Sequence, residues 1–108
     1  MSIQIGKYDF EGKYPFDGNV PDIRYIENRA GVYAILTETQ SKLYVVDIGE
    51  TATLQERLAH HDRNACWHEH NQGRLVFAVY YTPNMQQSGR MEIEQELRAK
   101  YSPSCGQR

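Results

Sequence analysis

Two apolar segments, separated by a short polar stretch, constrain the fold of this 108-residue chain more than any other feature. They are GVYAILTE (31–38) and KLYVVDIG (42–49), and both are rich in the β-branched and aromatic side chains that favour strands. The TQS residues between them are typical of a tight turn. Together the two segments predict an antiparallel hairpin.

Asp47 is the unexpected residue of this hairpin, because it interrupts an otherwise apolar strand. A carboxylate taken out of water costs several kcal/mol unless it is paired or neutralised. We therefore expect Asp47 either to lie at a solvated end of the strand or to have a functional role.

The N-terminal residues 1–29 are interrupted by glycines and prolines, with aromatic side chains between them. This pattern predicts an irregular arm or a short hairpin packed on the core. The aromatic residues of the arm could stack on unpaired bases, but we expect them to cover the sheet. They are Tyr8, Phe10, Tyr14 and Phe16.

Beyond the hairpin, the sequence predicts a helix, a strand and a second helix. TLQERLAHH (53–61) begins with Thr53 and Glu56 at the spacing of a capping box. RLVFAVYYT (74–82) has the composition of a strand, and GRMEIEQELRAKY (89–101) has helical periodicity. The expected fold is α+β, with a β-β-α-β-α core over 30–108. A three-stranded antiparallel sheet is flanked by helices, and the N-terminal arm packs on this one globular domain.

Composition narrows the functional classes. The formal net charge of -2 argues against a protein that coats nucleic acid by bulk electrostatics. Any anion-binding face is expected in the second half, where basic residues outnumber acidic ones. No apolar run approaches the roughly 18 residues of a membrane span, and the start lacks a signal-peptide pattern, so no membrane association and a cytoplasmic location are expected. Cys66 and Cys105 are too few for a disulfide framework, which fits a reducing compartment, although one bridge between them stays open.

The segment HHDRNACWHEHN (60–71) contains several zinc-ligand side chains. They are His60, His61, Cys66, His68 and His70. No CxxC or HxxxH frame is present, and the segment is polar, as loops are. We expect a loop in which Trp67 packs on the core, with no structural zinc, and in which His68 or His70 is free to contact a phosphate.

Several short motifs occur in an order that resembles the GIY-YIG nuclease domain, over about residues 30–106. Gly31, Val32 and Tyr33 match the first triplet, and Asp47, Ile48 and Gly49 match the second. The single residues that match are Arg57, His61 and Glu94, with Leu97 and Pro103 following Glu94 at the family's intervals. Two positions depart from the pattern, because Asp47 replaces a tyrosine and Gly106 stands where many members have Asn.

The resemblance implies a divalent-metal-dependent endonuclease with Tyr33, Asp47, Arg57, His61 and Glu94 in its active site. Arg57 and His61, spaced i and i+4, would share a helix face and meet the phosphate. Glu94 would hold one Mg²⁺ or Mn²⁺, with tyrosines helping to activate water.

Structural alternatives stay open for these residues. Arg57 and Glu94 each suit a solvated helix face, Tyr33 suits the core, and His61 suits a helix C-terminus, where a partly charged imidazole is favoured.

Two hypotheses about Asp47 follow. In the first, it acts as a base or as a second metal ligand beside Glu94, and the domain is a nuclease that acts on nucleic acid, with DNA favoured over RNA. In the second, it repels phosphate, and the loss of Asn at Gly106 further weakens the site. The domain is then a degenerate module that binds nucleic acid or a protein without cleaving. We prefer the first hypothesis, in which the domain is a nuclease. Separately, the exposed edge of a small sheet makes a homodimer an open alternative.

Overall fold

The computed structural model describes residues 1–106, and an antiparallel six-stranded sheet forms its centre. The strands are β1 (Ser2–Ile5), β2 (Tyr8–Asp17), β3 (Val20–Pro21), β4 (Gly31–Glu38), β5 (Leu43–Thr51) and β6 (Arg74–Tyr81). Their order is β1-β2-β6-β4-β5, and β3 pairs with β2. The predicted hairpin is β4 with β5, and the predicted third strand is β6, so both predictions are confirmed.

The N-terminal arm continues the sheet instead of covering it. β2 pairs with β6, with Glu11 opposite Val79 and Pro15 opposite Val76, and β1 folds back onto β2. Phe10 is fully buried. The stretch YDFEGKY (8–14) alternates apolar and polar residues, which is the period of a half-buried strand. Of the two alternatives that the sequence left for the arm, the short hairpin is confirmed, as β1 paired with β2.

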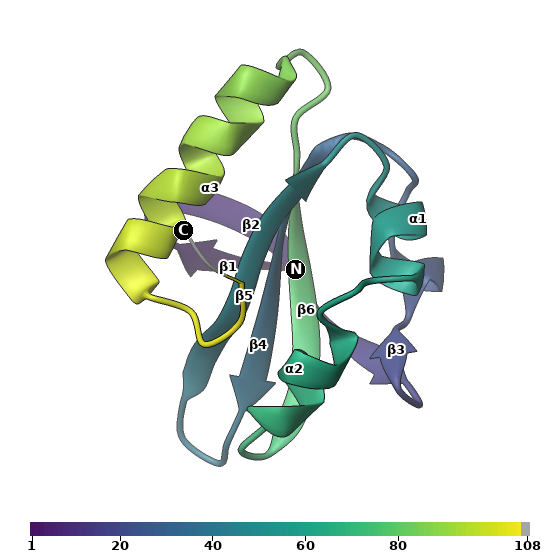
Figure 1. Ribbon diagram of the computed structural model, residues 1–108, viewed down its shortest axis with the longest axis vertical. Coiled ribbons are helices and arrows are strands. Elements are labelled where there is room, and N and C mark those ends of the chain that lie inside the picture. Colours follow the sequence, from purple (N-terminus) through teal and green to yellow (C-terminus); the bar gives the residue numbers. More distant parts are fainter. Residues whose placement is uncertain (107–108) are drawn as a thin grey trace.

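Helices cover both faces of the sheet. Side chains alternate along a strand, so Tyr33 and Ile35 of β4 point to one face, while Val32 and Ala34 point to the other. The first face packs against α1 (Leu54–Ala59) and α2 (Asn64–Glu69), and the second packs against α3 (Gln87–Tyr101). Figure 1 shows α3 along one side of the central strands and α1 and α2 along the other.

The helix predicted after the hairpin is confirmed, but its extent, its cap and the loop expected after it were wrong. The predicted helix 53–61 forms only as Leu54–Ala59, and the Thr53 side chain makes no capping hydrogen bond with any described residue. The expected loop before β6 contains α2, whose Trp67 is fully buried. A short 3-10 helix, η1 (Ile23–Tyr25), precedes β4. Among residues 1–106, no helix is long and apolar enough to cross a membrane.

A disulfide joins α2 to the segment after α3. It links Cys66 to Cys105, with 6.0 Å between their Cα atoms, so the bridge that the sequence left open is formed. The backbone N–H of Cys105 also donates to the carbonyl of Val46 at 2.9 Å. The C-terminal segment is therefore attached to both α2 and β5, beside Asp47.

Candidate active site

Tyr33 lies at the centre of the predicted site, directly over Gly49. The two residues are paired across β4 and β5, and a Cβ atom at position 49 would overlap the Tyr33 phenol. The glycine of the second triplet therefore makes room for the tyrosine of the first. This packing leaves Tyr33 buried, with its hydroxyl toward the segment that follows α1.

His61 contacts the Tyr33 hydroxyl through Nε2 at 2.5 Å. Its other ring nitrogen, Nδ1, lies 3.0 Å from the backbone N–H of Arg63, which is a donor only. Nδ1 must therefore accept, and the neutral ring carries its proton on Nε2 and donates to Tyr33. Burial, reinforced by the charges of Arg57 and Arg63, lowers the pKa of His61 to about 4. The imidazole is thus neutral at physiological pH.

The Tyr33 oxygen accepts from two groups, since Arg63 Nη2 also lies 3.4 Å away. Burial, and then the nearby charge of Asp47, raise the pKa of Tyr33 to about 12. Arg63 and Arg57 act in the opposite direction. The phenol is therefore protonated at neutral pH, in surroundings that already place two donors against its oxygen.

Arg57 forms the solvent-facing part of the site. Its side chain is 36% exposed, and Nη2 pairs with the exposed Asp62 at 2.9 Å. The hydrogen bond from Arg57 also lowers the pKa of Asp62. Because the charge of Arg57 influences both Tyr33 and His61, this guanidinium lies near them while remaining open to an anion from solvent.

Glu94 approaches the same cluster from α3. It is buried, its charge influences Tyr33, and its Oε2 lies 3.9 Å from Arg98 Nε one helical turn later. With Arg90 it forms a buried charged row along α3, and Arg90 pairs with Glu50 at 2.9 Å. The solvated-face alternative for Glu94 is therefore wrong.

Asp47 is fully buried, and three side chains surround its carboxylate. Oδ2 accepts from Arg63 Nε at 2.8 Å and from Trp67 Nε1 at 2.8 Å. Oδ1 accepts from Arg98 Nη2 at 2.5 Å and from Arg63 Nη2 at 3.3 Å. The register of β5 shifts between the partners of Ile35 and Leu36, and such a bulge can re-aim a side chain.

This environment differs from both sequence hypotheses for Asp47. A base or metal ligand needs a lone pair that faces the substrate or ion, and here four hydrogen bonds occupy the two oxygens. A group that repels phosphate needs an uncompensated charge, and here two guanidinium groups compensate it. The arrangement supports a structural role for Asp47.

Gly106 belongs to the same arrangement. Its φ is +79°, and a Cβ atom there would overlap the guanidinium of Arg98. Asparagine tolerates positive φ better than most residues, but it would still displace Arg98. Gly106 therefore makes room for the Arg98 guanidinium that pairs with Asp47, so one arginine contacts both positions that depart from the GIY-YIG pattern.

The sequence reasoning missed Arg63, Trp67 and Arg98 as members of this cluster. Arg63 and Arg98 lie 16 and 51 positions from Asp47, and local periodicity carries no information about such pairs. A usable signal was the spacing of Arg90, Glu94 and Arg98. Residues four apart share a helix face, and this charged row runs beside the apolar Ile93 and Leu97.

The acids of the site fit one divalent cation better than two. Both carboxylate oxygens of Asp47 accept hydrogen bonds from its three partners. Of the two acids predicted to ligate an ion, Glu94 is therefore the one that would do so. Mg²⁺ is commonly held by one or two carboxylates while keeping several waters. Arg57 is the guanidinium of the cluster whose counter-ion, Asp62, is itself exposed, so an anionic substrate would compete with an acid at the surface.

Comparison with solved structures identifies the fold. The chain is similar to the GIY-YIG N-terminal endonuclease domain of UvrC from Thermotoga maritima, in two point mutants described as bound to the catalytic divalent cation. Identity is 18% and 17%, each with a TM-score of 0.54, covering 76% of this chain and 87% of the other. No family model and no curated protein matches the sequence. The fold is therefore GIY-YIG-like, as the motifs predicted.

Proposed function

We propose that this domain hydrolyses phosphodiester bonds in nucleic acid with the help of one divalent cation, and that its substrate is DNA rather than RNA. One observation carries the proposal. Tyr33, Arg57, His61 and Glu94 come from four segments of the chain and meet in one charged neighbourhood on a GIY-YIG-like fold. The neighbours of that fold are endonuclease domains bound to a divalent cation, which supports the same reaction class.

In this proposal, Arg57 binds the substrate phosphate. Its guanidinium offers a planar pair of donors that matches two phosphate oxygens, and it is the most exposed of the five predicted site residues. Asp62 holds it in the absence of substrate. An incoming phosphate would replace Asp62, so Arg57 changes partner without leaving the site.

Tyr33 is the candidate general base for the attacking water once its phenol, which is protonated at neutral pH in the protein alone, has ionised. Its oxygen accepts from His61 Nε2–H and from Arg63, and both donors stabilise a phenolate more than a phenol. At neutral pH His61 donates to the Tyr33 oxygen through Nε2–H, because its Nδ1 accepts from the Arg63 N–H. A divalent ion on Glu94 would supply positive charge to the phosphoryl oxygens and favour ionisation of nearby acids.

Burial favours a second candidate function, a module that binds nucleic acid without cleaving it. Tyr33 and Glu94 are almost inaccessible to solvent, and the His61 side chain is completely buried. A substrate that reached only Arg57 would be bound but not hydrolysed. This candidate predicts binding that does not depend on a divalent cation.

A substrate panel separates the two candidates. Labelled single-stranded, duplex and branched DNA and RNA are incubated with the protein in Mg²⁺, in Mn²⁺ and in EDTA, and both cleavage and binding anisotropy are measured. Metal-dependent products on any substrate support the nuclease. Binding in EDTA without products in either metal supports the module, and the absence of both overturns the two proposals.

A further inference from the structure

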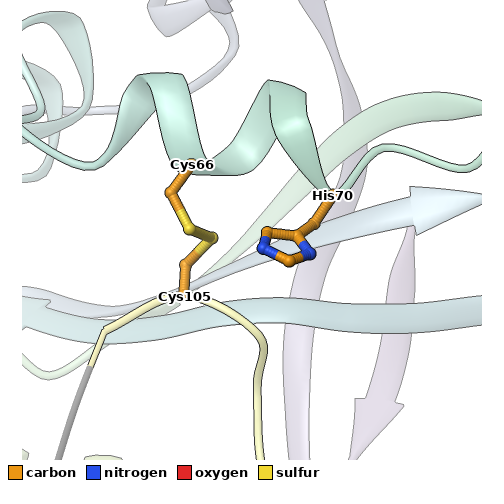
Figure 2. A group of neighbouring side chains, drawn as sticks. All are labelled: Cys66, His70 and Cys105. Carbon is orange, nitrogen blue, oxygen red and sulfur yellow. A yellow bond between two sulfur atoms is a disulfide. The ribbon is translucent and has the colours of Figure 1, made fainter.

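α2 and the segment after α3 bring together a set of metal-ligand side chains that the proposed reaction does not use. Cys66, His70 and Cys105 each place one ligand atom within 4.8 Å of the others. Figure 2 shows the His70 ring at the end of α2, beside the sulfurs of the Cys66–Cys105 bridge. We propose that the reduced form of this cluster is a binding site for Zn²⁺.

The helix creates this site. Cys66 and His70 are four residues apart, and the His70 backbone N–H donates to the Cys66 carbonyl at 3.1 Å, closing one helical turn. Both side chains therefore lie on one face of α2. In an extended loop, alternate residues would lie on one side, and His68 would join Cys66 and His70. In the structure, the Nε2 atom of His68 instead lies 2.8 Å from the Asn19 carbonyl oxygen. The sequence prediction of no structural zinc rested on the absence of CxxC and HxxxH frames and on the polar character of the segment, and it did not consider Cys105 as a ligand.

Both cysteines are held in place without the bridge. The backbone of Cys105 donates to Val46 at 2.9 Å, and its carbonyl accepts from Arg98 Nη1 at 3.1 Å. Cys66 precedes Trp67, which is buried and bonded to Asp47. Breaking the S–S bond therefore leaves two thiols close together against a fixed framework. This preorganisation lowers the entropic cost of assembling a metal site.

The donor set has the chemistry of zinc. Two thiolates and one imidazole are soft and borderline ligands that select Zn²⁺ over Mg²⁺, whereas the carboxylate of Glu94 has the opposite preference. Zn–S bonds of about 2.3 Å require the sulfurs to separate to roughly 3.7 Å around a tetrahedral ion. His70 is exposed and Cys66 is half-buried, so the ion enters from solvent and water takes the fourth position.

The chemical balance links the site to redox conditions. A dithiol or phosphine reductant supplies two electrons, and with two protons from solvent the bridge becomes two thiols. Binding Zn²⁺ then releases those two protons, because thiolates are the ligands. The oxidised protein offers His70 alone at this position, so the disulfide and the zinc site exclude each other.

The test measures zinc stoichiometry and affinity in a phosphine reductant and without it, using Zn²⁺ alone in competition with a chromophoric chelator. We expect about one Zn²⁺ per reduced chain and none at this site in the oxidised chain. His70→Ala should weaken binding by at least about 100-fold, since even groups behind a ligand are worth about 10- to 100-fold. His68→Ala, on the same helix but away from the sulfurs, is the matched control and should bind as the wild type does.

A second readout keeps the proposal falsifiable if a variant folds poorly. Co²⁺ added to reduced wild-type protein should give thiolate-to-cobalt charge-transfer absorption, which is absent after oxidation. Glu94→Gln should bind Zn²⁺ unchanged, so failure of the nuclease proposal does not affect this one. Reduced wild-type protein that binds no Zn²⁺, or that binds it equally well in His70→Ala, would overturn the proposal.

Discussion

Arg98 of α3 and Asp47 of β5 form an ion pair of 2.5 Å with both side chains almost completely buried. The pair connects the C-terminal helix to the edge strand of the sheet, and Arg98 also donates to the Cys105 carbonyl at 3.1 Å. A buried pair adds little net stability over a well-packed apolar pair, but the loss of one partner leaves an uncompensated charge. We therefore expect that the main role of Asp47 is to stabilise the fold, rather than to take part in a reaction.

Asp47→Asn should lower the free energy of unfolding by about 3–5 kcal/mol, because Arg98 and Arg63 would keep their charges without a counter-ion. Urea denaturation at neutral pH measures the change. Asp62→Asn is the control, since this acid is exposed and faces Arg57 and the neutral ring of His61, so its loss should change stability by about 0.5 kcal/mol or less. An Asp47→Asn protein as stable as the wild type would show that the cluster is not structural.

Gly106→Ala should destabilise the fold more than Gly18→Ala does. Both glycines have positive φ, so each substitution carries backbone strain of about 1 kcal/mol. At Gly18 a new methyl group would have no neighbour within 4 Å among residues 1–106, whereas at Gly106 it would overlap Arg98. The excess cost at Gly106 should largely vanish in an Arg98→Ala background, as a double-mutant cycle would reveal. Equal costs in both backgrounds would refute the steric link to Arg98.

The lowered pKa of His61 predicts that the folded protein loses stability in acid. Its pKa is lowered to about 4 in the folded protein from 6.5, so between these values the unfolded chain binds a proton that the folded chain does not. Stability should therefore fall as the pH falls from about 6.5 to 4, by about 3 kcal/mol in all. Unfolding free energies at several pH values measure this slope. His61→Gln should flatten it and His60→Gln, which changes an exposed neighbour, should not; an unchanged slope in His61→Gln would assign the effect elsewhere.

Reduction of the Cys66–Cys105 bridge should cost about 4 kcal/mol in the presence of EDTA. The two cysteines are 39 residues apart, and opening a loop of that length restores chain entropy to the unfolded state. Thermal and urea unfolding of oxidised and reduced protein measure the difference. Addition of Zn²⁺ to the reduced protein should recover part of it, because binding to the folded state alone stabilises that state. A reduced protein that is as stable as the oxidised one would contradict the expectation.

Arg57→Ala should abolish cleavage while leaving the fold intact. Removing one donor that meets developing charge typically costs about 10²–10³ in rate. The side chain is partly exposed and its partner Asp62 is at the surface, so the unfolding free energy should change by less than about 1 kcal/mol. Asp62→Asn should retain cleavage, because Asp62 competes with the phosphate for Arg57. Loss of folding in Arg57→Ala would instead assign this residue a structural role.

The parts of the fold that the sequence predicted are those that depend on local periodicity. The hairpin of β4 and β5, strand β6 and helix α3 all follow from the spacing of apolar residues within one element. For the arm, the sequence left a short hairpin and an irregular segment open, because Gly6, Gly12 and Pro15 resemble loop residues. In the structure Gly6, with φ of +59°, lies in the turn between β1 and β2.

The environment of Asp47 was beyond sequence reasoning for a physical reason. Its partners come from α2, from the residue before α2 and from α3, and they meet only after the chain folds. Motif spacing predicted Tyr33, Arg57, His61 and Glu94 as site residues, and it treated Asp47 as a replacement catalytic group. A residue that departs from a motif is thus better interpreted together with the residues around it, here Arg98 and Gly106.

Cleavage by Glu94→Gln and Glu92→Gln, compared with wild type in Mg²⁺ and in EDTA, tests the central claim most directly. Both acids lie on α3, but Glu94 is buried in the site and Glu92 is exposed. We predict Mg²⁺-dependent products from wild type and Glu92→Gln, and a loss of at least about 100-fold in a folded Glu94→Gln protein. Equal rates for the two variants, or no product on any DNA or RNA from a folded wild type, would contradict the nuclease.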